Sequence, residues 1–253
     1  MTIKRITDRL AYIRRKAFVY FEKYILQNRG NYYGQMGEDV IIYSLLVGFM
    51  PIEKVRYIDL GAGHPKWLSN TYLLYKKGAK GWCIDADERH RLSYFLFRRK
   101  DIFLKYCIDG DACEQTFYRA LNADRSTIDS ESHDFLIKHK FRIIKSFNIK
   151  TKTLDWVWTC SIHQDIDVLS IDTEGNELSI LQSLDFSKLR PKIICVECVD
   201  YLTGRNGKDA ETINELLLSK DYSLYSNTGV NLIFVDNAFI AARLRISSST
   251  PNV

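Results

Sequence analysis

The sequence has no apolar run long enough to cross a membrane, and its first residues lack the apolar core and cleavage site of a signal peptide. We therefore expect a cytoplasmic protein. Cys195 and Cys198 form a C-x-x-C pair, but no second pair completes a tetrahedral zinc site. No internal repeat is present, so 253 residues of ordinary composition predict one substantial α/β domain.

Residues 1–30 show the pattern of a basic amphipathic helix. Apolar residues recur at three- and four-residue steps from Ile3 to Tyr24, and the rest is rich in Lys and Arg, against only Asp8 and Glu22. The apolar stripe could dock on the chain's own domain or pair with a second copy as a homodimer. It could equally lie on an anionic membrane, which would make the protein peripheral at the inner face.

From residue 31 to 246, strand and helix patterns alternate, which predicts a largely parallel sheet with right-handed crossovers. The expected strands are Arg56–Leu60, Gly81–Asp85, Ile102–Ile108, Ile166–Ile171, Lys192–Val199, Tyr222–Ser226 and Asn231–Val235. The expected helices are Glu38–Phe49, Trp67–Lys77, Glu88–Arg99, Asn176–Leu184 and Glu211–Lys220. The short turn between the last two strands predicts a hairpin, so that the final strand runs antiparallel.

Two segments interrupt or end this pattern. The polar stretch from Asp109 to Ser146 is either an insertion that covers the site or a plain surface excursion. Residues 247–253, which begin with three serines, are expected to be a flexible tail.

A glycine turn joins the first strand to the helix that follows it. Gly61-Ala62-Gly63 follows an apolar strand, and Asp85 with Ala86 ends the next strand, 22 residues after Gly63. Glycine lets backbone N–H groups approach a ligand closely, and an acid about 20 residues later can accept hydrogen bonds from ribose hydroxyls. The pattern predicts a nucleotide-like cofactor.

The strand tips are acidic. Asp59, Asp85 and Asp109 lie at or after the first three tips, and Asp172 with Glu174 follows the fourth. Carboxylates gathered at one sheet edge favour a cationic ligand such as a sulfonium over the anionic pyrophosphate of a dinucleotide. The third glycine of the dinucleotide fingerprint is also missing, and no Tyr-x-x-x-Lys pair lies near the fourth strand, so a nicotinamide-dependent reductase is the weaker alternative.

Several motifs occur in a characteristic order. They are Gln35-Met36-Gly37-Glu38-Asp39, the glycine turn followed by His64-Pro65, Ser69-Asn70-Thr71, Thr153-Leu154-Asp155 and Asp172-Thr173-Glu174-Gly175-Asn176-Glu177. In this set the chain resembles the FkbM-type family of S-adenosylmethionine-dependent methyltransferases, in the branch with His-Pro after the glycine turn. One departure is Ser170, where many relatives carry lysine.

The resemblance implies a class I methyltransferase fold, which is a Rossmann-like seven-stranded sheet, with S-adenosyl-L-methionine as cofactor. It also implies methylation of oxygen, often on sugars of surface glycans or secondary metabolites. Gln35 and Glu38 would lie near the amino acid end of the cofactor, and Asn70 or Thr71 would meet its carboxylate. The alternative for Gln35, Glu38 and Asn70 is helix capping.

Methyl transfer to a hydroxyl requires a group that receives the hydroxyl proton. The candidates are His64, Asp172 and Glu174; with Glu197 the two acids could instead hold a divalent cation. The structural alternatives are a loop hydrogen bond for His64 and helix capping for the acids.

Two further functions stay open. A non-catalytic scaffold could have kept the fold, with the N-terminal helix as its working surface. Basic residues in the helix expected at Glu88–Arg99 raise the question of nucleic acid, but no recognition motif accompanies them, so we expect a small-molecule or glycan acceptor and no nucleic acid.

Overall fold

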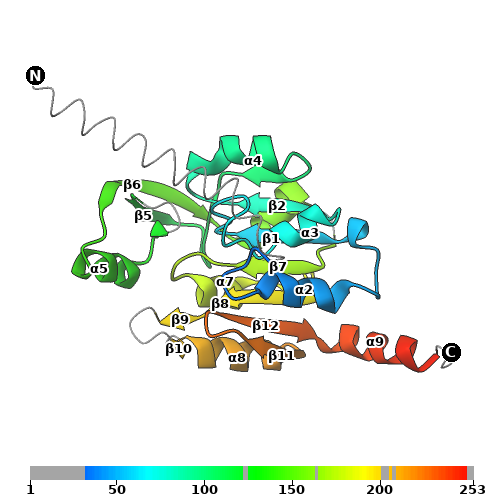
Figure 1. Cartoon of the computed structure of the whole chain (residues 1–253). Coiled ribbons are helices and arrows are strands. Elements are labelled where there is room, and N and C mark those ends of the chain that lie inside the picture. Colours follow the sequence, from blue (N-terminus) through cyan, green and yellow to red (C-terminus); the bar gives the residue numbers. More distant parts are fainter. Residues whose placement is uncertain (1–31, 122–124, 163–164, 201–204, 207–208, 250–253) are drawn as a thin grey trace, which may run out of the picture.

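The computed structural model describes residues 32–121, 125–162, 165–200, 205–206 and 209–249. At its centre lies a seven-stranded sheet of order β11-β12-β8-β7-β1-β2-β3 (Figure 1). Its strands are β1 (Arg56–Leu60), β2 (Lys80–Ile84), β3 (Ile102–Leu104), β7 (Val168–Ile171), β8 (Ile193–Glu197), β11 (Tyr222–Asn227) and β12 (Asn231–Asp236). All neighbours are parallel except β12, which is antiparallel to β8 and β11. The predicted fold class, with an antiparallel last strand, is confirmed.

Helices cover both faces of this sheet because its strands are apolar on both sides. On β1, Tyr57 packs with one layer while Ile58 and Leu60 pack with the other. The first layer contains α2 (Glu38–Leu46), α3 (Tyr72–Lys76), α4 (Arg91–Phe97) and α9 (Asn237–Ser249); the second contains α6 (Leu154–Val157), α7 (Glu177–Ser183) and α8 (Ala210–Ser219). Short helical turns occur at η3 (Ile52–Lys54), η4 (Glu88–His90) and Trp158–Ile162.

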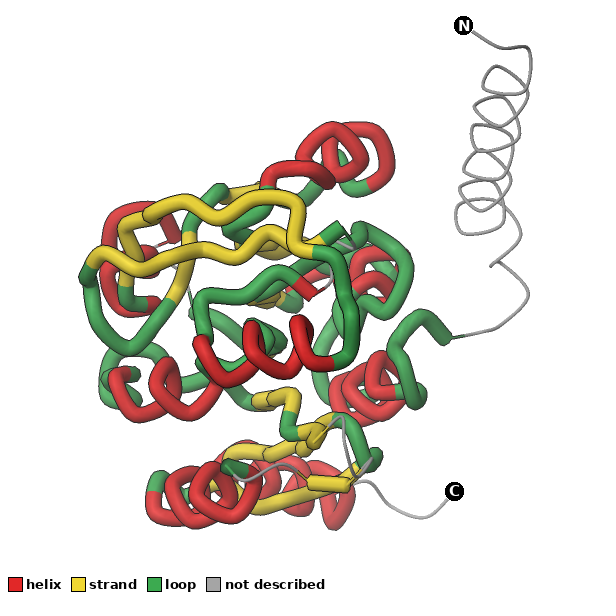
Figure 2. Tube along the Cα trace, turned by 90° about the vertical axis from the view of Figure 1, so that its left-hand side faces the viewer, coloured by secondary structure: helices red, strands yellow, loops and turns green. Residues whose placement is uncertain are grey.

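The segment between Asp109 and Ser146 is more regular than the sequence suggested. It contains β5 (Glu114–Ala120), α5 (Ser130–Lys138) and the start of β6 (Ile143–Lys152), which with β4 (Cys107–Ile108) form a second sheet of order β4-β6-β5. Figure 2 views the molecule from the side that carries this sheet. Half-buried Phe147 and Ile149 alternate with exposed polar residues along β6, but no residue before Thr151 is fully buried, so the apolar signal is weaker than in the central sheet.

Several expected elements are shorter than predicted, and two of them differ most. The strand expected at Ile102–Ile108 is divided between β3 in the main sheet and β4 in the second sheet. The helix expected at Trp67–Lys77 begins only at Tyr72, because Leu68 has a positive φ of 55°, which no α-helix accommodates.

The C-terminal helix is longer than the sequence suggested. Helix α9 continues to Ser249, although the tail was expected to begin at residue 247. A small ladder pairs β9 (Val199–Asp200) with β10 (Arg205–Asn206). The expected N-terminal helix at residues 1–30 lies outside the described residues. Among the residues that are described, no helix has the length and apolar character needed to span a membrane.

Candidate functional site

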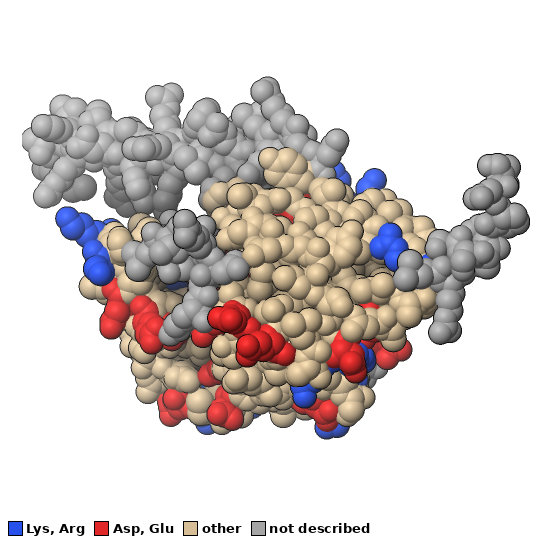
Figure 3. All heavy atoms as spheres, turned by 90° about the horizontal axis from the view of Figure 1, so that it is seen from below, with Lys and Arg blue, Asp and Glu red and all other residues tan. Residues whose placement is uncertain are grey.

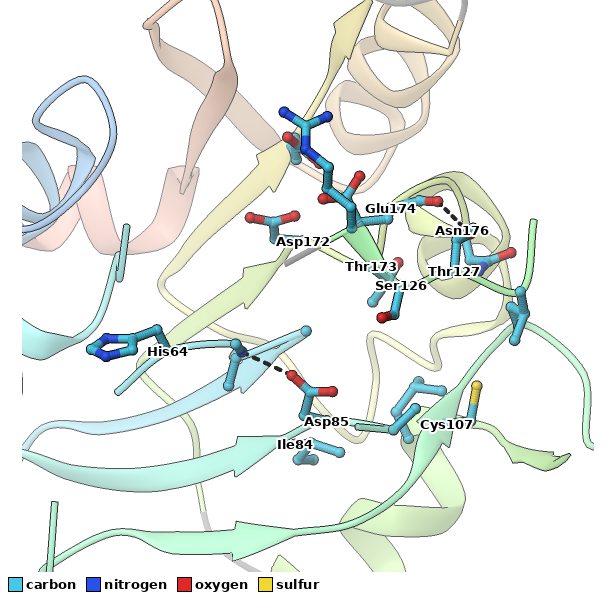
Figure 4. Close-up of a pocket in the computed structure, with 18 of the residues that line it drawn as sticks. His64, Ile84, Asp85, Cys107, Ser126, Thr127, Asp172, Thr173, Glu174 and Asn176 are labelled. Atoms are coloured by element: carbon cyan, nitrogen blue, oxygen red, sulfur yellow. Dashed lines mark hydrogen bonds between the residues drawn. The ribbon is translucent and has the colours of Figure 1, made fainter. Parts of the chain in front are cut away.

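A cavity of about 250 Å³ opens at the carboxyl ends of β1, β2 and β7 (Figure 4). This is the edge at which open α/β sheets bind ligands. The structure brings ten of the residues singled out in the sequence together around this cavity: Gln35, Gly61, Ala62, Gly63, His64, Asp85, Ala86, Asp172, Glu174 and Glu197.

The glycine turn is closed against the neighbouring strand end. Gly61 has a φ of 66°, and a Cβ atom there would lie 1.6 Å from the carbonyl oxygen of Asp172. Only glycine fits this position, because both its backbone angle and its neighbour exclude a side chain. The turn after β1 and the loop after β7 therefore form one packed wall of the cavity.

Asp85 stands at the tip of β2 and reaches into the cavity (Figure 4). Its two carboxylate oxygens accept hydrogen bonds from the backbone N–H groups of Gly63 (2.9 Å) and Asp87 (2.7 Å). A carboxylate oxygen can accept more than one hydrogen bond, so these contacts hold Asp85 in place and still allow it to receive ligand hydroxyls.

Three carboxylates meet on the other side of the cavity. Asp172 and Glu174 follow β7, Glu197 ends β8, and one oxygen of each lies within 4.8 Å of the others. Burial, together with the nearby charges of Glu197 and Glu174, raises the pKa of Asp172 well above its usual range. This cluster therefore binds a proton more tightly than an exposed carboxylate would, and its oxygen atoms could also accept a divalent cation.

A fourth acid, Glu177, shapes the loop that carries this cluster. It accepts hydrogen bonds from the backbone N–H and the hydroxyl of Thr173 and from the backbone N–H of Gly175. Burial, helped by the charge of Glu197, raises the pKa of Glu177 to about 7. Glu177 is thus a loop-forming residue behind the cavity wall.

His64 makes hydrogen bonds within its own loop, which is the structural alternative that the sequence left open. Its Nδ1 atom accepts hydrogen bonds from the backbone N–H groups of Lys66 (3.1 Å) and Trp67 (2.9 Å). In the neutral ring the proton then sits on Nε2, so the lone pair that a base would use is already engaged. Figure 4 shows the His64 ring directed away from Asp85 and Asp172.

Three predicted cofactor residues lie in a polar network beneath the turn and do not line the cavity. Thr71 donates to Asp59 (2.5 Å), Asn70 donates to Ser170 (3.3 Å), and the fully buried Arg98 donates to Thr71 (2.9 Å). Burial raises the pKa of Asp59, which has Arg98 as its nearest cation at 4.0 Å. Ser170, the family departure, is part of this network.

Two more predicted cofactor residues have partners elsewhere. Glu38 begins α2 and accepts hydrogen bonds from the side chains of Thr228 (2.8 Å) and Asn231 (3.1 Å) at the hairpin of β11 and β12. Asp109 accepts from Ser179 (2.5 Å) on α7 and from Gln115 (3.1 Å) on β5. Both acids connect elements that surround the site.

The segment between β4 and β6 contributes lining residues that the sequence did not identify. They are Phe117, Arg125, Ser126, Thr127 and Ile128. The hydroxyl of Thr127 donates to the carbonyl oxygen of Glu174 (2.8 Å), so the segment is joined to the acidic loop. Of the two interpretations of this segment, the structure supports an insertion that covers the site.

A family model described as the methyltransferase FkbM domain matches residues 59–224, which is most of the chain and includes the cavity. The chain belongs to the FkbM methyltransferase family. The alternative of a nicotinamide-dependent reductase is therefore set aside. No curated protein shows significant sequence similarity to this FkbM methyltransferase.

Solved structures give weaker likenesses to this FkbM methyltransferase. A methyltransferase FkbM from Methylobacillus flagellatus KT is 13% identical with a TM-score of 0.42; the match covers 72% of this chain but only 44% of that protein. A Burkholderia thailandensis 1,6-didemethyltoxoflavin N1-methyltransferase with bound S-adenosylhomocysteine is 11% identical, with a TM-score of 0.40, 90% of this chain and 88% of that one covered. A fibrillarin/Nop5p complex is 9% identical, with a TM-score of 0.43 and 79% of each chain covered. The assignment rests on the family match.

The family implies S-adenosylmethionine as methyl donor, and the charges of the cavity suit it. Four carboxylates line the cavity, from Asp85, Asp172, Glu174 and Glu197, whereas among its described lining residues Arg125 is the single Lys or Arg. Such a surface favours a cationic sulfonium and disfavours the pyrophosphate of a dinucleotide.

Proposed function

We propose that this FkbM methyltransferase uses S-adenosylmethionine to methylate a hydroxyl group of a glycan or a glycosylated metabolite. The observation that carries the proposal is a single cavity with an acid for ribose recognition on one side and a carboxylate cluster on the other. The first feature serves the donor, and the second serves the acceptor.

The donor would lie along the glycine turn. Asp85 would accept hydrogen bonds from its ribose hydroxyls, and Gln35 at the cavity rim would contact its amino acid end. When bound, S-adenosylmethionine supplies an electrophilic methyl group on a positively charged sulfur. The role of the turn and of Asp85 is to hold the donor in one orientation, since alignment alone can supply about 7–11 kcal/mol of the barrier.

Asp172 and Glu197 are suited to receive the proton that the acceptor hydroxyl loses. When both carboxylates are ionised they repel each other, so the pair has a raised affinity for one proton, which the acceptor hydroxyl would supply. A carboxylate with a raised pKa is a stronger base than an exposed one. Glu174, which lies beside them, would orient the acceptor.

The remaining lining favours an acceptor with several hydroxyl groups. Ser126, Thr127 and Asn176 bring polar side chains to the cavity near Glu174 (Figure 4), and Arg125 also lines the cavity. Hydroxyl and amide groups of this kind can both donate and accept, which is what recognition of a sugar requires. The polar lining supports a glycan better than an apolar acceptor.

Donor binding is tested first, by calorimetric titration of the full chain with S-adenosylmethionine and, separately, with NADH. We expect heat with the first ligand only. Asp85→Ala should weaken donor binding roughly a hundredfold, because two charge-assisted hydrogen bonds are lost. Asp85→Asn keeps one acceptor oxygen, so its affinity for the donor should lie between those of the unchanged chain and of Asp85→Ala. Binding of NADH in place of the sulfonium would contradict the proposal.

Methyl transfer is tested with a donor labelled in its methyl group and with glycolipid and polysaccharide extracts as acceptors. We expect label in alkali-stable methyl ethers of sugars. Asp172→Asn should lower turnover at least about a hundredfold while donor affinity changes little, because removal of a general base costs 10²–10⁴ in rate. Label in alkali-labile esters would contradict the assignment to hydroxyl groups, and donor binding without any transfer would favour the scaffold alternative.

The same carboxylates support metal-assisted deprotonation as a second candidate. Asp172, Glu174 and Glu197 offer oxygen ligands, which Mg²⁺ and Ca²⁺ prefer. Transfer activity should then disappear after treatment with a chelator and return on addition of one of these cations. Activity that withstands the chelator would leave the proton-sharing pair as the mechanism.

A further inference from the structure

Helix α4 has an outer face that is unusually apolar for a surface helix. Leu92, Phe95 and Leu96 are 68%, 69% and 47% exposed, and their spacing places them side by side on one face. The opposite face is anchored by Tyr94 and by Arg98 just after the helix, both of which are buried. The exposed apolar face is therefore held rigidly outward. Such exposed patches mark interaction surfaces.

Cations flank this face. Arg91 lies at its start, and Arg99 and Lys100 lie just after its end; all three are exposed, and none has an ion pair within the part of the chain that the structure describes. Nearby acids are neutralised, since Asp87 pairs with Arg89, and Glu88 pairs with Lys105. We call Leu92, Phe95 and Leu96 with Arg91, Arg99 and Lys100 the α4 patch.

The α4 patch contains no acidic residue, unlike the opposite side of the molecule. Helix α4 lies at the top in Figure 1, whereas α8 and β11 lie at the bottom. The view from below in Figure 3 shows Asp and Glu side chains over part of that opposite face, together with several Lys and Arg side chains. A negatively charged surface would meet acidic side chains there and none in the α4 patch.

We propose that the α4 patch docks on an anionic lipid membrane, with its apolar side chains in the interface and its cations among the headgroups. Apolar anchors flanked by Lys and Arg are the combination that interfacial binding requires. This inference does not depend on the acceptor proposed above.

The charge of the patch argues against two other occupants. The segment at residues 1–31 is itself strongly basic, so it would bring like charges against Arg91, Arg99 and Lys100. Two copies facing each other through the patch would do the same. A lipid surface of opposite charge has no such penalty.

Tyr33 connects the start of the described residues to the end of α4. The carbonyl oxygen of Tyr33 accepts a hydrogen bond from the backbone N–H of Ser69 (3.1 Å), and the hydroxyl of Ser69 accepts one from Arg98 (3.3 Å). The basic stretch of sequence before residue 32 is therefore joined to the domain close to the cations of the α4 patch.

The test uses the full chain in sedimentation with vesicles of neutral phosphatidylcholine and of phosphatidylcholine mixed with phosphatidylglycerol. We expect binding to the anionic vesicles only, weakened by salt. Changing Arg91, Arg99 and Lys100 together to Gln should reduce the affinity roughly a hundredfold, because each cation near anionic headgroups contributes about fivefold. The double variant Leu92→Ser/Phe95→Ser should reduce it at least about tenfold.

Controls keep the result specific to this helix. Leu218→Ser removes a comparably exposed leucine from α8 at the opposite end of the molecule and should bind vesicles like the unchanged chain. The variant Phe95→Trp should show fluorescence quenching by brominated lipid. Calorimetry with S-adenosylmethionine should give the same affinity for the α4 variants, so that a failure of docking is separate from a failure of the proposed activity.

Three outcomes would overturn the proposal. The first is equal vesicle binding by the Leu92→Ser/Phe95→Ser variant and the unchanged chain, which would assign binding to another segment. The second is the absence of quenching in the Phe95→Trp variant although it binds the vesicles. The third is a dimer in light scattering that the α4 variants convert to monomer, which would make a second copy the occupant.

Discussion

Glu174 shows how a single residue can be held in an unfavourable conformation at the site. Its φ of 60° lies in the left-handed region, and its carbonyl oxygen is held by the hydroxyl of Thr127. For a residue with a Cβ atom this conformation costs roughly 1–2 kcal/mol. Such strain persists where the surrounding contacts fix the backbone, which is common at functional sites.

This strain predicts an unusual order of stability among variants. Glu174→Gly should be more stable than Glu174→Ala by about 1 kcal/mol, because glycine adopts a positive φ without strain. Urea denaturation of the two variants measures the difference. At Leu218, in a regular helix, the same pair of substitutions should give the reverse order.

Ten of the residues that line the cavity could be identified from the sequence, and the other features of the site could not. Asp85 and the glycine turn follow from strand ends and spacing, which are local properties. The embedding of Asp59 and Thr71 under Arg98 could not be predicted, because it depends on a contact with a residue distant in the chain. Arg125 was missed because nothing in its own neighbourhood indicates a site.

Among the elements, α4 supports the cofactor turn from behind. The hydroxyl of Tyr94 donates to the carbonyl oxygen of Ala62 (2.8 Å), and Arg98 reaches the carbonyl oxygen of Pro65 (3.4 Å) and the hydroxyl of Ser69. Arg98 also forms a buried ion pair with Asp101 (2.6 Å). The turn therefore depends on a helix that contributes nothing to the cavity lining itself.

Substitutions that remove this support should destabilise the fold most where they leave a buried charge without its partner. Arg98→Met should lower the free energy of unfolding by about 3–5 kcal/mol, because Asp101 and Asp59 lose their buried cation. Tyr94→Phe removes one neutral hydrogen bond and should cost only about 1 kcal/mol. Urea denaturation measures both. Equal losses in the two variants would contradict the importance assigned to the ion pair.

Regular elements were predicted well where the apolar pattern was strong. The strands of the central sheet agree with the pattern to within a few residues, since the inner strands β1, β2, β7, β8 and β12 are buried almost throughout. The second sheet was missed because no residue of β6 before Thr151 is fully buried, so pairing with β5 decides its conformation. The late start of α3 results from the loop at His64 and Leu68, which helical periodicity does not reveal.

At the scale of the whole molecule, buried acids determine how stability depends on pH. Burial raises the pKa of Asp39, Asp59, Asp172 and Glu177. At pH values between the unfolded-state pKa and the folded-state pKa of each group, the folded state therefore binds more protons than the unfolded state. The stability contributed by these groups is complete below their unfolded pKa, and it is lost as the pH rises through the folded value.

Glu177 gives this effect a defined window. Its pKa rises from 4.5 to about 7, so its contribution should fall by about 3 kcal/mol between these pH values. We expect thermal unfolding to show a higher Tm at pH 5 than at pH 7.5, and Glu177→Gln to reduce that difference. Asp185→Asn is the control, because the pKa of exposed Asp185 is lowered to about 2 and does not titrate in this range. A Tm that rises towards pH 7.5 would contradict the assignment.

The small sheet of β4, β5 and β6 has a consequence for how the enzyme can diversify. Cys107, Ile108 and Phe117 of this sheet line the cavity together with the glycine turn and Asp85, and the two groups come from separate stretches of the chain. Under the proposed function, exchanging the stretch between Asp109 and Ser146 for that of a relative should change the acceptor preference as a module. Donor binding should be retained, because the glycine turn and Asp85 lie outside the exchanged stretch.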